Sequence, residues 1–183
     1  MATGKFPLRI DLERPAGRVE QFLRALRCRH DPAVDERLRS LLDDERQWTL
    51  LARLSPYDRL HHLDVYERLL SAGFTDPDLL RAALLHDAGK ADERGRVRLR
   101  HRVARVILRV VAPGALRRFG ARRSRLWHGM YLAEHHASLG ARAAGKAGAS
   151  PRCCALIAAH ESGPDGSDPE LLALVAADEG LHR

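Results

Sequence analysis

The stretch RAALLHDAGK, residues 81–90, places a histidine and an aspartate directly after an apolar run. The apolar residues are typical of an ordinary buried helix, but this helix would end in the side chains of His86 and Asp87. Burying a neutral polar group without a partner costs roughly 2–7 kcal/mol, and burying a charge costs more. A metal ion would compensate this pair, and its other ligands should then lie elsewhere in the chain.

Length and composition indicate one globular domain of ordinary size. The chain has 183 residues, of which 45% are hydrophobic, enough for a substantial core. Its best apolar run, 103–111, is interrupted by two arginines, so we expect no transmembrane segment. The polar N-terminus does not resemble a secretory signal. Three cysteines, of which Cys153 and Cys154 are adjacent, are typical of reduced thiols, so we expect a cytoplasmic protein.

Most local signals are helical. Four positions pair a capping residue with a following proline, which is typical of helix starts: Ser55-Pro56, Asp76-Pro77, Ser150-Pro151 and Asp168-Pro169. Gly73, Gly89 and Gly148 stand where left-handed caps would end helices. We therefore predict an all-α fold, with a flexible N-terminal extension over residues 1–17 and a single all-α domain over residues 18–183.

Positive charge is concentrated in one part of the chain. Residues 91–127 carry twelve arginines against two acidic residues, whereas the whole chain has a net charge of +7, so the remainder is slightly acidic. Such a block attracts anions, although a solvated arginine face needs no ligand. For the Arg-rich segment 96–125 we expect a small anionic substrate as the partner, rank nucleic acid behind it, and place a membrane surface last.

The same region contains a predicted amphipathic helix over residues 98–111. Its apolar side chains fall on one stripe with arginines opposite, and the stripe consists of Leu99, Val103, Val106, Ile107 and Val110. In a chain of this size we expect the stripe to pack on the core. A membrane-surface role would instead require the stripe to be exposed.

Several ionisable side chains lie on the apolar faces of predicted helices, where residues three, four and seven apart meet. A single such histidine is usually a hydrogen-bonded core residue, but an apolar-face aspartate needs a cation or several donors. Spacing does not decide between His61 and His62. The full set is His61 (or His62), His86, Asp87, His136, His160 and Asp178. A convergent metal site would explain all six at once.

The order of these residues resembles the HD domain superfamily of metal-dependent phosphohydrolases, whose signature is H…HD…D. HHLDVYERLLSAG (61–73) resembles the helix of its first ligand, ALLHDAGK (83–90) the HD-x-G-K variant, and LLALVAADE (171–179) the closing aspartate helix. The segment 135–160 resembles the part that carries two further histidines in dinuclear members. The family register selects His61 over His62 and His136 over His135. The resemblance covers about residues 55–180.

The resemblance implies an all-α HD-type bundle around a central metal site. His61, His86, Asp87 and Asp178 would hold one ion, and Asp87 would bridge to a second ion held by His136 and His160. Mixed nitrogen and oxygen ligands suit a divalent transition metal, such as Mn, Fe, Co, Ni or Zn.

The implied activity is hydrolysis of a nucleotide or related phosphoester through a metal-bound hydroxide. In this hypothesis Asp87 positions the nucleophile and Lys90 contacts the phosphate. Two alternatives stay open on the same fold: a diiron oxygenase, and a non-catalytic module that senses a ligand or binds RNA.

Overall fold

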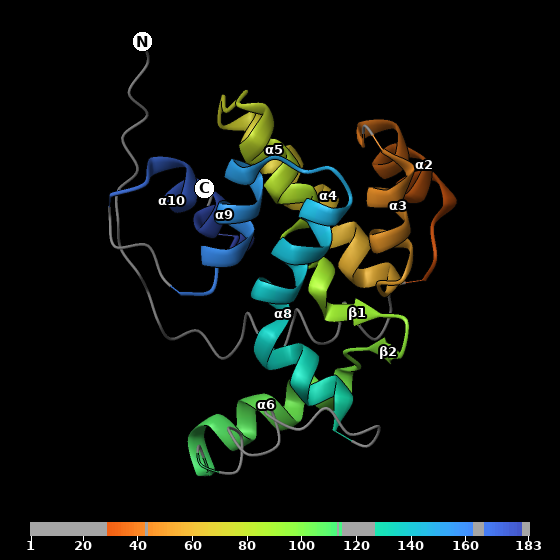
Figure 1. Cartoon of the computed structure of the whole chain (residues 1–183), viewed down its shortest axis with the longest axis vertical. Coiled ribbons are helices and arrows are strands. Elements are labelled where there is room, and N and C mark those ends of the chain that lie inside the picture. Colours follow the sequence, from red (N-terminus) through yellow and green to blue (C-terminus); the bar gives the residue numbers. More distant parts are fainter. Residues whose placement is uncertain (1–28, 43, 113, 115–126, 163–166, 181–183) are drawn as a thin grey trace.

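The computed structural model describes residues 29–180 except 43, 113, 115–126 and 163–166. The described part consists of helices, one short hairpin and the connecting turns (Figure 1). The elements are α2 Pro32–Leu41, α3 Glu45–Ala52, α4 Pro56–Ser71, α5 Pro77–Leu85, the 3₁₀ helix η1 Ala88–Lys90, β1 Ala91–Asp92, β2 Gly95–Arg96, α6 Leu99–Val111, α8 His128–Lys146, α9 Pro151–Ala159 and α10 Pro169–Asp178. The predicted all-α class is confirmed. The extension predicted over residues 1–17 lies outside the described residues.

The four predicted helix starts are confirmed at α4, α5, α9 and α10. In each, the capping side chain accepts a hydrogen bond from a backbone N–H of the first turn, and proline follows, because its missing N–H is not needed there. The helix α2 begins in the same way at Asp31 and Pro32. None of the described helices has both the length and the apolar character that crossing a bilayer requires.

The core is centred on α5, which contacts α4, α9 and α10 (Figure 1). Five of the nine residues of α5 are buried, which agrees with its near-continuous apolar sequence. Large leucines from the neighbouring helices, including Leu69, Leu156 and Leu174, complete this core. The chain therefore leaves α5 at His86 while still inside the protein, and the next residues are buried as well.

Gly89 has a different role from the predicted helix cap. Gly73 and Gly148 do adopt the left-handed conformation, each with φ of 86°, but Gly89 is not among the residues with positive φ. A Cβ on Gly89 would lie 2.1 Å from the carbonyl oxygen of His136 and 2.5 Å from the backbone nitrogen of Gly140. Glycine is needed here because η1 and α8 approach each other backbone to backbone.

A short hairpin follows η1. β1 pairs with β2 in antiparallel register, with Ala91 opposite Arg96. Asp92 closes the turn, because its Oδ1 accepts hydrogen bonds from the backbone N–H groups of Arg94 and Gly95. The hairpin leads the chain out of the core and into α6.

The orientation of α6 contradicts the prediction that its apolar stripe packs on the core. Val106 and Ile107 are 51% and 54% exposed, and Val103 is exposed as well. Figure 1 shows α6 lying across the first turns of α8, at the periphery of the described structure. The side chain of Val110 is outside the described set.

The reason for this orientation lies on the opposite face of α6. Arg102 pairs with the buried carboxylate of Asp58 in α4. Arg105 pairs with Glu134 of α8 at 2.6 Å and with Glu161 at 3.1 Å. Leaving a buried charge such as Asp58 unpaired would cost about 3–5 kcal/mol. These pairs therefore turn the arginine face inward and the apolar stripe outward.

Candidate metal centre

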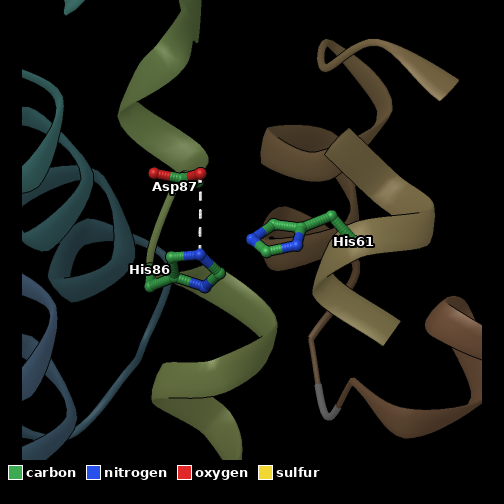
Figure 2. Close-up of side chains that lie close together, drawn as sticks. All are labelled: His61, His86 and Asp87. Carbon is green, nitrogen blue, oxygen red and sulfur yellow. Dashed lines mark ion pairs between the residues drawn. The ribbon is translucent and has the colours of Figure 1, made fainter. Parts of the chain in front are cut away.

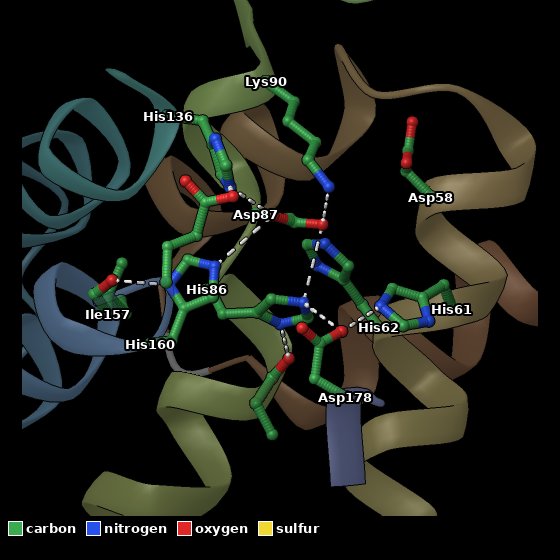
Figure 3. A network of polar contacts seen from close by, with 12 residues as sticks. Asp58, His61, His62, His86, Asp87, Lys90, His136, Ile157, His160 and Asp178 are labelled. Carbon is green, nitrogen blue, oxygen red and sulfur yellow. Dashed lines mark hydrogen bonds and ion pairs between the residues drawn. The ribbon is translucent and has the colours of Figure 1, made fainter. Parts of the chain in front are cut away.

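The structure brings all six predicted ligand residues together. Two groups of candidate ligand atoms each lie within 4.8 Å of one another: the first is His61, His86 and Asp87, and the second is Asp87, His136 and His160. Figure 2 shows the first group, with the His61 ring of α4 directed towards His86. Figure 3 shows that Asp178 joins the same network. Asp87 belongs to both groups.

Three of the histidines are held in the same way. The Nδ1–H groups of His86, His136 and His160 donate to the carbonyl oxygen three residues earlier, at 2.9, 3.1 and 2.7 Å. A neutral imidazole that donates from Nδ1 presents a lone pair on Nε2. Each Nε2 then faces the centre of the cluster, with its ring orientation set by the backbone, as in many metal-binding histidines.

Asp87 occupies the position that a bridging ligand would need. Its Oδ1 lies 3.1 Å from Nε2 of His136 and 3.7 Å from Nε2 of His160. Its Oδ2 lies 3.5 Å from Nε2 of His86 and also contacts the ammonium group of Lys90. The two oxygens of one buried carboxylate thus face different histidines (Figure 3).

The other side of the cluster is made by His61 and Asp178. Asp178 ends α10, and its Oδ1 lies 2.7 Å from Nε2 of His61 and 3.4 Å from Nε2 of His86. Asp178 therefore contacts two residues of the first group, His61 and His86, and it is not among the residues of the second group.

The buried neighbour of His61 supports the cluster from behind. The Nδ1–H group of His62 donates to the carbonyl oxygen of Leu84 at 2.6 Å, and its ring lies 4.7 Å from that of His86. Burial and the neighbouring His86 lower the pKa of His62 to about 3, so it remains neutral. The sequence did not indicate this role, because helical spacing placed both neighbours near the same face.

The electrostatics fit a bound cation. Burial opposes a charge on His86, but the carboxylates of Asp87 and Asp178 outweigh it and raise the pKa of His86 to about 9. The pKa values of Asp87 and Asp178 lie well below the ordinary value despite burial, because Lys90 and His86 favour the first carboxylate and His86 and His61 the second.

One atom of the cluster is also incompletely satisfied. Nε2 of His86 is buried and has no hydrogen bond of good geometry to any described residue, and the same is true of Nε2 of the neighbouring His62 and of Nδ1 of His128. Buried nitrogens of this kind are uncommon and favour a ligand. A divalent ion at this nitrogen would replace the proton and neutralise both nearby carboxylates. The donor set present therefore fits a transition metal.

Two further charged side chains lie at the edge of the cluster. Lys90, which the sequence singled out for phosphate, is half-buried and contacts Asp87. Glu161 lies 3.6 Å from Nε2 of His136 and is held by Arg105. Lys90 of η1 therefore contacts the cluster directly, whereas Arg105 of α6 contacts it indirectly, through its ion pair with Glu161.

The fold and the cluster together define an all-α protein with a candidate site for two metal ions. Comparison with protein-family models, with curated proteins and with solved structures finds no match for this chain. The chemistry proposed below therefore relies on the residues themselves and on the motif resemblance.

Removing metal is expected to destabilise the protein more at alkaline than at mildly acidic pH. In the metal-free protein the folded-state pKa of His86, about 9, is above the ordinary value of 6.5. The imidazolium therefore stabilises the fold fully below pH 6.5, and this stabilisation is lost as the pH rises through about 9. Thermal scans with and without chelator should show a drop in melting temperature that grows across this range.

The variant Asp178→Ala provides the control for this prediction. It removes one of the two carboxylates beside His86, so both the metal affinity and the pKa of His86 should fall. A chelator should then lower the melting temperature of the variant less than that of the wild type, with a weaker pH dependence. Equal chelator effects in the two proteins would show that Asp178 is not a ligand.

Proposed function

We propose that this chain is a metal-dependent phosphohydrolase or phosphodiesterase of the HD type, acting on a nucleotide or a related phosphoester. The observation that carries the proposal is the position of Asp87, whose carboxylate is shared by two groups of candidate ligands. The groups come from distant segments in the order His61, His86-Asp87, His136, His160 and Asp178, the order of the motif.

The residues of the cluster would have two separate roles, metal binding and phosphate binding. The four histidines and two aspartates would hold the cations and keep them close together through Asp87. Bound in this way, two divalent ions supply activation of water and neutralisation of phosphate charge. The ammonium group of Lys90, which contacts Asp87, would donate to a phosphoryl oxygen.

The environment of Lys90 supports an anionic substrate. Lys90 extends from η1 towards the side of the cluster on which Asp58 and α4 lie (Figure 3). Arg102 reaches the same Asp58 from α6, so two cationic side chains approach this edge of the cluster. Phosphate groups are recognised by such pairs of positive donors.

The proposal is tested by a substrate panel. Purified protein loaded in turn with Mn, Fe, Co, Ni or Zn would be incubated with nucleoside mono-, di- and triphosphates, cyclic nucleotides and an aryl phosphodiester. We expect release of phosphate or nucleotide with at least one metal, and its loss with chelator. Turnover that needs iron and dioxygen and cleaves no phosphoester would support an oxygenase instead, and metal binding without turnover would support a sensing module.

A further inference from the structure

We propose that the outward face of α6 binds an anionic lipid surface, with its aliphatic side chains inserted among the lipids. This proposal is independent of the metal cluster, because it uses the opposite face of the helix. The face consists of Val103, Val106, Ile107 and Val111, with Arg100 at its N-terminal end.

The apolar residues of this face form a continuous exposed stripe. Val103, Val106, Ile107 and Val111 are spaced by three, four and eight residues, which places them on one side of a helix. They are four of the six exposed large hydrophobic side chains of the described part, and three of them are the most exposed of the six, with Val111 reaching 76%. A clustered stripe of β-branched side chains in water is unfavourable and indicates a binding surface.

The helix cannot readily rotate to hide this stripe. Arg102 and Arg105 are on its other side, where they pair with Asp58, Glu134 and Glu161. Rotation by half a turn would bury the valines but would break these pairs and leave Asp58 buried without its partner. The exposed orientation is therefore a stable feature of the fold.

The positive charge of the segment that contains α6 favours binding to an anionic surface. From residue 94 to residue 133 the sequence contains twelve arginines and no aspartate or glutamate. Among the described ones, Arg94, Arg96, Arg98 and Arg100 are exposed and lead into the apolar stripe. An amphipathic helix that combines an aliphatic face with flanking basic residues has the chemistry of helices that lie in the interface of anionic membranes.

Two other occupants fit this surface less well. A second copy of the chain would bring two arginine-rich segments together, and their like charges would repel. A nucleic acid would satisfy the arginines but would leave the valine and isoleucine side chains exposed, since binding there relies on basic and aromatic groups. A lipid surface satisfies both the charge and the apolar stripe.

Vesicle flotation tests the proposal. The full chain would be mixed with vesicles of phosphatidylcholine alone or of phosphatidylcholine with phosphatidylserine, at low and at high salt. We expect binding to the phosphatidylserine vesicles and little binding to the neutral ones. The double variant Val106→Asp/Ile107→Asp should weaken binding by about tenfold or more, because two aliphatic side chains are lost from the inserted face.

A matched control adds the same charge elsewhere. Leu60 and Leu70 of α4 are exposed to 37% and 40%, so Leu60→Asp/Leu70→Asp introduces two carboxylates at comparable positions away from α6. This control should bind vesicles nearly as well as the wild type, and circular dichroism should show that both variants are folded.

Three results would overturn the proposal. The first is absence of wild-type binding to phosphatidylserine vesicles at low salt. The second is equal loss of binding in the α6 variant and in the control. The third is absence of vesicle binding together with a wild-type protein that is a dimer in size-exclusion chromatography and an α6 variant that is a monomer. The exposed face of α6 would then be a contact between two copies of the chain.

Discussion

Replacing Asp87 with asparagine is expected to reduce phosphoester hydrolysis by about a thousandfold or more, since charge stabilisation by the bound ions is worth several kcal/mol. Asparagine has nearly the same shape but is neutral, and its amide nitrogen is not a metal ligand. The two carboxylate oxygens of Asp87 face His86, His136 and His160, and the substitution would leave only one oxygen able to bind a metal ion. Steady-state rates at saturating metal, with metal content measured on the same samples, check this prediction.

The control for this variant is Asp64→Asn. Asp64 is a half-buried aspartate of the same helix as His61, but it belongs to neither candidate ligand group. This substitution removes one negative charge without touching the cluster, so rate and metal content should stay close to those of the wild type. Undiminished metal content in Asp87→Asn would contradict the proposed bridging role of Asp87.

The second large effect is expected at Gly89, where alanine should destabilise the fold by about 3 kcal/mol or more. The added Cβ would meet the carbonyl oxygen of His136 at 2.1 Å and the nitrogen of Gly140 at 2.5 Å, and both are backbone atoms of α8. Because neither atom can rotate away, α8 must shift from η1. Such a shift moves His136 from Asp87, so the affinity for a second metal ion should fall together with the free energy of unfolding.

Chemical denaturation and metal titration of Gly89→Ala measure both effects, with Gly145→Ala as the matched control. Gly145 is an exposed residue of α8, and a Cβ there would meet only the sulfur of Cys154, at 3.3 Å. Alanine also has the higher helix propensity, so the free energy of unfolding of this control should change by less than about 1 kcal/mol. Similar losses in the two variants would show that the contact between Gly89 and α8 is not critical.

Local sequence signals were sufficient to predict the helical fold and most of the side chains that meet in the candidate metal centre. A capping residue before proline marks a helix start wherever it occurs, because the capping bond and the missing N–H involve only neighbouring residues. The apolar faces of these helices then carry His86, Asp87, His136, His160 and Asp178 inward. Their convergence follows because apolar faces of one small domain share one core.

The choice between adjacent histidines depended on the tertiary structure. His61 and His62 both border the apolar face of α4, so periodicity left them equivalent, and only the motif resemblance favoured His61. In the structure His61 meets Asp178, whereas His62 is bound to the carbonyl oxygen of Leu84. The decisive partners come from α10 and from the end of α5, which no local pattern in α4 can indicate.

The role of Gly89 and the rotation of α6 were also decided only by tertiary structure. A glycine after a helix is compatible with a left-handed cap or with close packing, and the approach of α8 makes it the latter. The pattern of α6 defines an apolar and a basic face but not which of them turns inward. Asp58, Glu134 and Glu161 lie on other elements, and their pairing with Arg102 and Arg105 outweighs the burial of a few valines.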